Sequence, residues 1–268
     1  MSKIQEICRD VRRDIVTTLA TAGCGHPGGS LSAVEIVTEL YFEKTHVDPA
    51  NPRDPDRDRF VLSKGHATLM MYSVLAERGY FPAEELKSFR KDWSRLPGHP
   101  DMNKVPGIDM TSGSLGQGLA AANGMALAGR LQKRDYHVYV LMGDGELQEG
   151  MIWEAAMAAA HYRLDHVIAF VDRNGLQIDG TTEQVMGLEP LADKWRSFGW
   201  HVQEVDGHDT AALGAAVDTA KAAKGRPSVI IARTVKGKGV SFMENKVEFH
   251  GKAITKEQAA MAMAEMEG

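Results

Sequence analysis

The stretch Val138–Ile178 reads VYVLMGDGELQEGMIWEAAMAAAHYRLDHVIAFVDRNGLQI and contains two apolar runs typical of buried strands. The first run ends in Gly143-Asp144-Gly145, and the second ends in Asp172-Arg173-Asn174-Gly175. An apolar helix that begins near Glu146 is predicted between them. Because parallel neighbouring strands need a crossover of this length, the stretch predicts one β–α–β unit of a parallel sheet.

Asp144 and Asn174 are therefore expected just beyond the ends of two successive strands. Their oxygen atoms suit Mg2+, which prefers a few protein oxygens together with phosphate oxygens. The Gly145 N–H can donate to a phosphate, and the following helix directs its positive end there. The alternative is an ordinary strand–turn–helix with an Asp cap and an Asn-Gly turn. The separation of 30 residues between positions 144 and 174, with a strand before each, favours the metal–phosphate site.

Strands and helices alternate through the rest of the chain. The strands are nearly continuous apolar runs, which is typical of a parallel sheet covered by helices on both faces. We therefore predict an α/β fold of three layers, α/β/α, with a mainly parallel central sheet. No linker or repeat interrupts it, so residues 1–268 are expected to form a single domain. Other strands are predicted at 59–62, 200–205 and 228–233, and helices at 2–22, 33–41, 66–78, 82–89, 118–132, 191–197, 209–223 and from 255 onward.

Residues 25–30 are predicted to form a tight loop between the first two helices. Pro27 lacks an N–H donor, and the glycines around it free the backbone. Ser30 or Ser32 is then expected to cap the next helix.

The composition excludes several classes of protein. The 268-residue chain carries 31 basic and 36 acidic residues, for a formal net charge of −5, which argues against nucleic-acid binding through bulk charge. The two cysteines, Cys8 and Cys24, are too few for a disulfide framework and indicate the reducing cytosol. No stretch suits a signal peptide or a membrane span. We expect a cytoplasmic protein that binds neither nucleic acid nor membranes.

Four histidines lie in loops beside glycine or proline: His26, His66, His99 and His250. A single histidine of this kind is usually a structural or surface residue. Four of them, with three expected near the same sheet edge, favour a binding site. Their spacing does not suit zinc, whereas imidazoles that hydrogen-bond hydroxyl groups and phosphate oxygens fit the pattern.

The loop Val235–Gly239 carries Lys236 and Lys238, which could meet a phosphate or lie on a solvated surface. Sheets of this type bind ligands at the carboxyl ends of their strands, where Lys236 would emerge with His66, Asp144 and Asn174. There is no Walker A sequence and no Gly-x-Gly-x-x-Gly after the first strand, so nucleoside triphosphates and dinucleotides have little support. Without further motifs, a generic nucleotide-binding α/β module would be the default.

These motifs resemble the N-terminal half of transketolase, a thiamine diphosphate-dependent enzyme. Thiamine diphosphate enzymes share a Gly-Asp-Gly that is followed by an Asn after the next strand, as in Gly143-Asp144-Gly145 and Asn174. That motif alone would identify only the cofactor, but transketolase-like features cover nearly the whole chain. They are Gly25-His26-Pro27-Gly28, Ser63-Lys64-Gly65-His66, Pro97-Gly98-His99-Pro100, Gly113-Ser114-Leu115-Gly116-Gln117-Gly118, Gly143 to Gly150, Asn174-Gly175-Leu176 and His250-Gly251.

The resemblance implies a thiamine diphosphate-binding fold and a set of cofactor contacts. Asp144, Asn174 and the Leu176 carbonyl would bind the metal, which would be Mg2+, with Ca2+ or Mn2+ as alternatives. The residues that would hold the cofactor are His66, Gly113, Ser114, Leu115, Gly145, Glu149, Asn174 and His250.

The resemblance also implies roles toward the substrate and between subunits. His26, His99 and His250 would be catalytic and would face the hydroxyl groups and carbonyl of the substrate. Glu149 matches a glutamate that, in transketolases, helps to link the two active sites across the dimer. Ser114 stands where many full-length transketolases have Pro, and looks more like split transketolases, whose halves are separate chains.

The main departure from the family is length, because a complete transketolase chain is more than twice as long. The pyrimidine-binding domain is missing, and so is its glutamate. The resemblance therefore implies an N-terminal subunit that is active only with a C-terminal partner carrying that domain, as a heterotetramer. The pair would transfer a two-carbon ketol unit from a ketose to an aldose, with sugar phosphates of the pentose phosphate pathway as the default substrates. The alternatives are the alpha subunit of a 2-oxo acid dehydrogenase and a non-catalytic protein with the same fold.

Overall fold

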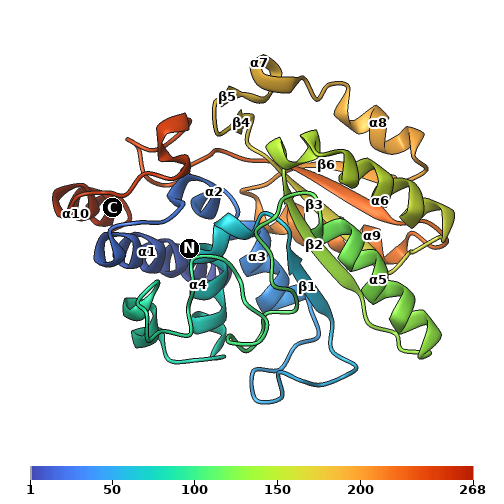
Figure 1. The fold of residues 1–268 in the computed structure, drawn as a ribbon, viewed down its shortest axis with the longest axis horizontal. Coiled ribbons are helices and arrows are strands. Elements are labelled where there is room, and N and C mark those ends of the chain that lie inside the picture. Colours follow the sequence, from blue (N-terminus) through green and yellow to red (C-terminus); the bar gives the residue numbers. More distant parts are fainter. Residues whose placement is uncertain (1, 268) are drawn as a thin grey trace.

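The computed structural model describes residues 2–267 and is built around a five-stranded sheet (Figure 1). In spatial order the strands are β1 (Arg59–Leu62), β2 (Val138–Gly143), β3 (Val167–Arg173), β7 (Ser228–Arg233) and β6 (His201–Asp206). All neighbouring strands are parallel, as predicted. Because β2 and β3 pair directly, the residues that follow them emerge side by side at one edge of the sheet.

Helices cover both faces of the sheet, which confirms the three-layer α/β/α fold (Figure 1). On one face lie α1 (Lys3–Ala22), α3 (Val34–Glu39), α4 (Thr68–Arg78) and α9 (Thr210–Ala222). On the other face lie α5 (Gly118–Leu131), α6 (Gly150–His161) and α8 (Leu191–Ser197). The closing helix α10 (Lys256–Glu265) packs beside α1. Within residues 2–267, no helix combines the length and apolar character needed to cross a membrane.

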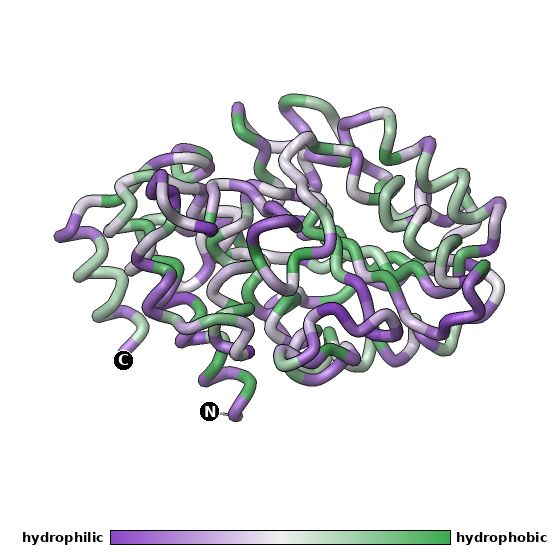
Figure 2. The backbone as a smooth tube through the Cα atoms, turned by 60° about the horizontal axis from the view of Figure 1, so that its bottom comes forward, coloured by the Kyte–Doolittle hydropathy of each residue, from purple (hydrophilic) through white to green (hydrophobic). Residues whose placement is uncertain are grey.

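Successive side chains of each strand point to opposite faces of the sheet, so they pack into two separate hydrophobic cores, one on each face. On β2, Tyr139 and Leu141 enter the core under α1 and α4, whereas Val138 and Val140 enter the core under α5 and α6. All four side chains are fully buried. Since both faces of the inner strands β2, β3 and β7 are covered, nearly all of their positions are apolar, whereas the edge strand β6 is partly exposed and carries polar residues. Figure 2 shows the inner strands as apolar segments through the middle of the molecule.

Residues 27–31 form a short helix, α2 (Pro27–Leu31), where a tight loop was predicted. Pro27 occupies the first helical position, where no N–H donor is needed. Gly28 packs so closely that an added Cβ would lie 2.9 Å from the Phe249 carbonyl oxygen. Tertiary packing therefore holds a helix that the local sequence disfavours.

The predicted serine caps of α3 are also wrong, because its N-cap residue is Ala33. Ser30 Oγ donates instead to the His26 carbonyl, and Ser32 Oγ donates to the Asp172 carboxylate at 2.6 Å. Both hydroxyl groups thus fix the His26 segment rather than the following helix.

The helix expected near Glu146 begins at Gly150, after a 3-10 turn, η4 (Gly145–Gln148). Glu146 is buried rather than lying on an exposed first turn, and its carboxylate accepts hydrogen bonds from the backbone N–H groups of Gly116 and Gly143. The remaining elements are η1 (Leu40–Lys44), η2 (Gly65–Ala67), η3 (Ala83–Ser88), β4 (Leu176–Gln177), β5 (Gly180–Thr181), α7 (Thr182–Met186) and η5 (Val247–His250).

Candidate active site

A cavity of about 180 Å3 lies at the carboxyl edge of the sheet. Asp144 follows β2, Asn174 follows β3 and Lys236 follows β7, and all three side chains line this cavity. The other predicted site residues that line it are His66, Leu115, Gly145, Glu149, Leu176 and His250. Residues from six distant parts of the sequence are thus brought to one place by the parallel sheet.

The four predicted histidines form one cluster at this edge. The ring centroid of His26 lies 5.5 Å from that of His66, 6.0 Å from that of His99 and 5.6 Å from that of His250. The rings of His66 and His250 are 4.9 Å apart. Gly113 lies against this cluster with a φ of +148°, and an added Cβ would lie 3.0 Å from the His99 ring, so a larger residue would displace His99.

Burial lowers the pKa of all four clustered imidazoles below the ordinary value for histidine. For His250 the value falls to about 4, with the neighbouring Lys236 as the second cause. The cluster is therefore neutral at pH 7, and each ring has one donor and one acceptor nitrogen. Such rings are suited to hydrogen-bonding hydroxyl and carbonyl groups.

Of the predicted residues, His26, His99, Gly113 and Ser114 do not line the cavity. Ser114 lies on the loop that carries Leu115. Its hydroxyl oxygen accepts a hydrogen bond from Gln117 Nε2 at 3.0 Å. Leu115 is therefore the residue of this loop that borders the cavity, whereas Gly113 packs against His99.

The oxygens of the predicted metal site fit a hard cation. Asp144 Oδ2 accepts hydrogen bonds from Gly175 N at 2.6 Å and from Arg173 Nη1 at 3.2 Å. The Leu176 carbonyl lies 3.4 Å from Lys236 Nζ. A carboxylate, an amide and a carbonyl are ligands that Mg2+ accepts, and two of these oxygens already attract cationic side chains. No cluster of three or more His, Cys, Asp or Glu residues suited to a metal occurs between residues 2 and 267.

A buried ion pair between Lys64 and Asp172 supports the cavity floor and was not predicted. Their side chains are 1% and 0% exposed. Burial opposes the ionised form of Asp172, but the Lys64 ammonium holds the pKa of this carboxyl below its usual range. Lys64 Nζ also donates to the Gly29 carbonyl at 2.8 Å. The pair therefore fixes α2, and with it His26, against the ends of β1 and β3.

The two lysines of the loop after β7 have different surroundings. Lys236 is 3% exposed, and its Nζ lies 3.1 Å from His250 Nδ1. Burial and the nearby Lys64 lower its pKa to about 8. Lys238 points away, with its Nζ 3.8 Å from Glu244. The sequence left open whether these lysines contact a phosphate site or lie on a solvated surface. Lys236 lines the cavity, whereas Lys238 lies at the surface.

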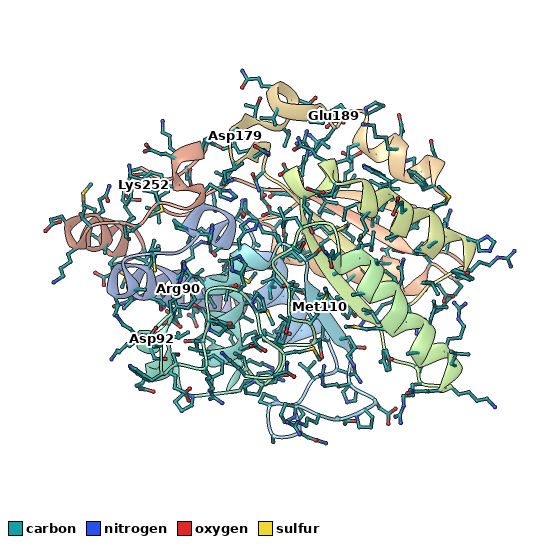
Figure 3. All side chains as sticks on the ribbon, viewed as in Figure 1. Arg90, Asp92, Met110, Asp179, Glu189 and Lys252 are labelled. Atoms are coloured by element: carbon teal, nitrogen blue, oxygen red, sulfur yellow. The ribbon has the colours of Figure 1, made fainter. Side chains whose placement is uncertain are left out.

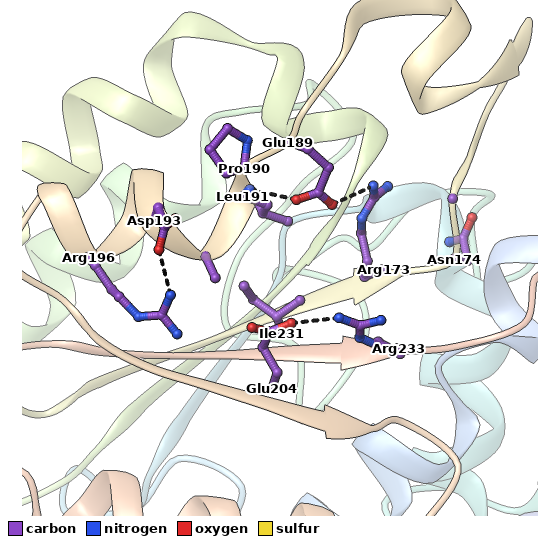
Figure 4. Close-up of a pocket in the computed structure, with 12 residues that line it drawn as sticks. Arg173, Asn174, Glu189, Pro190, Leu191, Asp193, Arg196, Glu204, Ile231 and Arg233 are labelled. Carbon is purple, nitrogen blue, oxygen red and sulfur yellow. Dashed lines mark hydrogen bonds and ion pairs between the residues drawn. The ribbon is translucent and has the colours of Figure 1, made fainter.

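A larger cavity of about 500 Å3 shares Asn174 with the first one in its lining (Figure 4). Its charged walls are mostly paired, Arg173 with Glu189, Arg196 with Asp193 and Arg233 with Glu204. Neither Asp144 nor any of the clustered histidines lines it. The smaller cavity is therefore the better candidate for the reaction site.

The family model for the thiamine diphosphate-binding domain of transketolase matches residues 3–266. The chain belongs to the transketolase family. The matched domain binds thiamine diphosphate, which confirms the predicted cofactor. The family also decides against a generic nucleotide-binding module and against the alpha chain of a 2-oxo acid dehydrogenase.

Relatives of similar length are named as subunits of transketolases. The chain is 50% identical to the 6-deoxy-6-sulfo-D-fructose transketolase subunit SqwG of Clostridium sp. (strain MSTE9), over 98% of this chain and 96% of the relative. It is 43% identical to one subunit of the apulose-4-phosphate transketolase of Phocaeicola vulgatus, over 95% and 90%. The chain is accordingly a transketolase subunit that corresponds to the N-terminal half of the enzyme, as predicted.

Solved transketolases share the fold but are longer. The enzyme from Leishmania mexicana superposes with a TM-score of 0.93 at 34% identity, over all of this chain and 42% of that chain. The enzyme from Campylobacter jejuni gives a TM-score of 0.93 at 32% identity, over 100% and 43%. The chain thus spans about two fifths of the length of these enzymes.

Proposed function

We propose that this chain binds thiamine diphosphate with a divalent cation and, with a C-terminal transketolase subunit, transfers a two-carbon ketol unit between sugars. The observation that carries the proposal is that oxygens suited to a cation line one cavity together with His66 and His250, whose rings contact that of His26 in the histidine cluster. Residues 1–268 would act as one diphosphate-binding domain, in the cytoplasm.

Asp144, Asn174 and the Leu176 carbonyl would hold the cation, Mg2+ in the first instance and Ca2+ or Mn2+ as substitutes. Gly145, Lys236 and His66 would contact the diphosphate, since all three line the same cavity. The Gly145 N–H donates to Asp144 Oδ1 at 2.8 Å and would turn to the phosphate when Asp144 binds the cation. The Gly113-Ser114-Leu115 loop would border the thiazolium. When bound, thiamine diphosphate supplies the electron sink for cleavage of the carbon–carbon bond beside the substrate carbonyl.

His26, His99 and His250 would orient the substrate. Because burial keeps these rings neutral, each can donate one hydrogen bond and accept another as charge develops on substrate oxygens. The ring of His26 makes edge-to-face contacts with those of His99 and His250, at centroid distances of 6.0 and 5.6 Å, so the three rings could address neighbouring oxygens of one sugar.

We propose a ketose with a terminal anionic group as the donor. The relatives that support this choice are named for a sulfosugar and for a sugar phosphate. This chain also has a cationic side chain near the histidines, that of Arg90. Its guanidinium packs against Gly98, the residue before His99, so closely that a Cβ added to Gly98 would lie 3.0 Å from Arg90 Nε. Figure 3 shows Arg90 on the α4 side of the molecule.

The partner would supply the pyrimidine-binding domain, and two copies of each chain would form a heterotetramer. Support comes from relatives of matching length that are named as subunits, and from solved enzymes that are more than twice as long. Glu149 lines the cavity and would contribute to the contact between the two active sites.

The test is to co-purify this chain with a candidate partner that carries the C-terminal half of a transketolase. Ketol transfer is then measured from 6-deoxy-6-sulfo-D-fructose (sulfofructose) and from fructose 6-phosphate. Activity is expected only with both chains, thiamine diphosphate and a divalent cation. Transfer by this chain alone, or failure of the purified pair to bind thiamine diphosphate, would contradict the proposal.

A further inference from the structure

Lys236 is held at the cavity by the backbone of the loop after β7. Its Nζ lies 3.1 Å from His250 Nδ1 and 3.4 Å from the Leu176 carbonyl. The loop itself is tied down immediately before Lys236, where the Val235 N–H donates to His208 Nε2 at 2.8 Å. The position of the ammonium therefore depends on a histidine on the far side of the loop.

His208 connects the loop to a buried carboxylate. Because its Nε2 accepts from the Val235 N–H, its Nδ1 carries the proton and donates to Glu35 Oε2 at 2.9 Å. Glu35 also pairs with Arg12, whose Nη2 lies 2.6 Å from Glu35 Oε1. Arg12 Nε in turn donates to the Lys238 carbonyl at 3.1 Å. The network of Arg12, Glu35 and His208 therefore hydrogen-bonds to the loop both before and after Lys236, at Val235 and at Lys238.

The network is buried and electrostatically complete. The side chains of Arg12 and Glu35 are each 10% exposed, and that of His208 is 14% exposed. Burial opposes the ionised form of Glu35, but the hydrogen bond from His208 and the charge of Arg12 keep its pKa below the usual value. Removing one partner from such a set leaves buried polar groups unpaired, so the network has one preferred arrangement.

None of the three side chains lines the cofactor cavity. We propose that Arg12, Glu35 and His208 are positioning residues, which hold the Lys236 ammonium where it meets the anionic end of the cofactor. The proposal rests on the proposed thiamine diphosphate site and extends it to residues of α1, α3 and the turn after β6.

The first test uses Glu35→Gln, which keeps the shape of the side chain and removes its charge. Amide hydrogen exchange at Val235 and Gly237 in the purified chain is expected to speed up about tenfold. In the two-subunit complex, the Kd for thiamine diphosphate with Mg2+ is expected to rise about tenfold. The matched control is Glu39→Gln, another buried carboxylate one turn further along α3, which packs against Gly214 of α9 and should change neither quantity.

The second test asks whether Glu35 acts through Lys236. In a Lys236→Met background, Glu35→Gln is expected to raise the Kd by less than twofold. An equal rise in both backgrounds would mean that Glu35 acts through the fold and would overturn the proposal, as would unchanged exchange at Val235. If the unmodified complex does not bind thiamine diphosphate, the proposed function fails, while the exchange measurement still decides whether the network holds the loop.

Discussion

The Arg173 guanidinium lies 3.2 Å from the Asp144 carboxylate, so the carboxylate assigned to the cation already carries a cationic neighbour. Arg173 ends β3, and its side chain is 15% exposed, against 2% for Asp144. The same guanidinium reaches Glu189 at 3.1 Å across the larger cavity (Figure 4). Arg173 therefore links the proposed metal site to the segment that follows β3, and its charge opposes a cation at Asp144.

Replacing Arg173 by Gln is expected to tighten binding of a divalent cation to the chain without cofactor. Two like charges a few ångströms apart repel by several kcal/mol at most in a partly buried site, so a gain of about fivefold in affinity is a modest expectation. Mn2+ binding followed by electron paramagnetic resonance would measure it. Arg196→Gln is the matched control, because Arg196 lines the same cavity but pairs with Asp193. Weaker Mn2+ binding in Arg173→Gln would show that Arg173 orients Asp144 rather than opposing the metal.

Substitutions at Asp144 and His26 are expected to separate cofactor binding from turnover. Asp144→Ala removes a cation ligand, so the complex should lose both the metal and thiamine diphosphate. His26→Ala removes a hydrogen-bonding ring, so kcat should fall about 100-fold or more while the Kd for thiamine diphosphate changes less than threefold. Calorimetry and steady-state kinetics on the two-subunit complex measure the two effects. Equal loss of cofactor affinity in both variants would contradict the division of roles.

The parts of the site that the sequence predicts are those with a local signal. Asp144 and Asn174 each follow an apolar strand, so their meeting at one sheet edge follows from parallel topology alone. The ion pair of Lys64 and Asp172 joins positions 108 residues apart. Each residue lies in a motif that the sequence marks, but no local pattern indicates that the two pair with each other. Glu146 likewise accepts a hydrogen bond from the N–H of Gly116, 30 positions away, a contact that no local pattern indicates. Contacts between buried charged residues that are distant in the sequence produce no periodic pattern, so they cannot be predicted from the sequence alone.

The stability of the fold is expected to fall below pH 6.5, and His137 is expected to contribute to this fall together with the buried histidines of the cluster. The His137 ring stacks on His166 with centroids 4.7 Å apart, and burial followed by the charge of His166 lowers its pKa from 6.5 to about 4. The unfolded chain therefore binds a proton that the folded chain rejects, and stability declines as the pH falls from 6.5 toward 4, by up to about 1.4 kcal/mol per pH unit.

Urea unfolding at pH 7 and pH 5 would measure this decline. His137→Gln should reduce the difference between the two pH values, whereas His161→Gln, at an exposed position of α6, should leave it unchanged. An undiminished pH dependence in His137→Gln would assign the decline to other groups.

Arg90 is expected to select for an anionic substrate. It adopts a φ of 60°, and its N–H donates to the Leu96 carbonyl at 2.9 Å, which closes the loop and brings its guanidinium beside Gly98. Burial lowers the pKa of His99, and the positive charge of Arg90 lowers it further, which shows that the guanidinium lies near His99. His99 is one of the histidines proposed to face the substrate. Arg90→Ala should raise KM for sulfofructose or fructose 6-phosphate about tenfold, since a charge-assisted hydrogen bond contributes roughly 1.5 kcal/mol or more. The matched substrate is uncharged fructose, for which KM should stay within twofold. A similar rise in KM for charged and uncharged ketoses would mean that Arg90 stabilises the loop but does not bind the anionic group of the substrate.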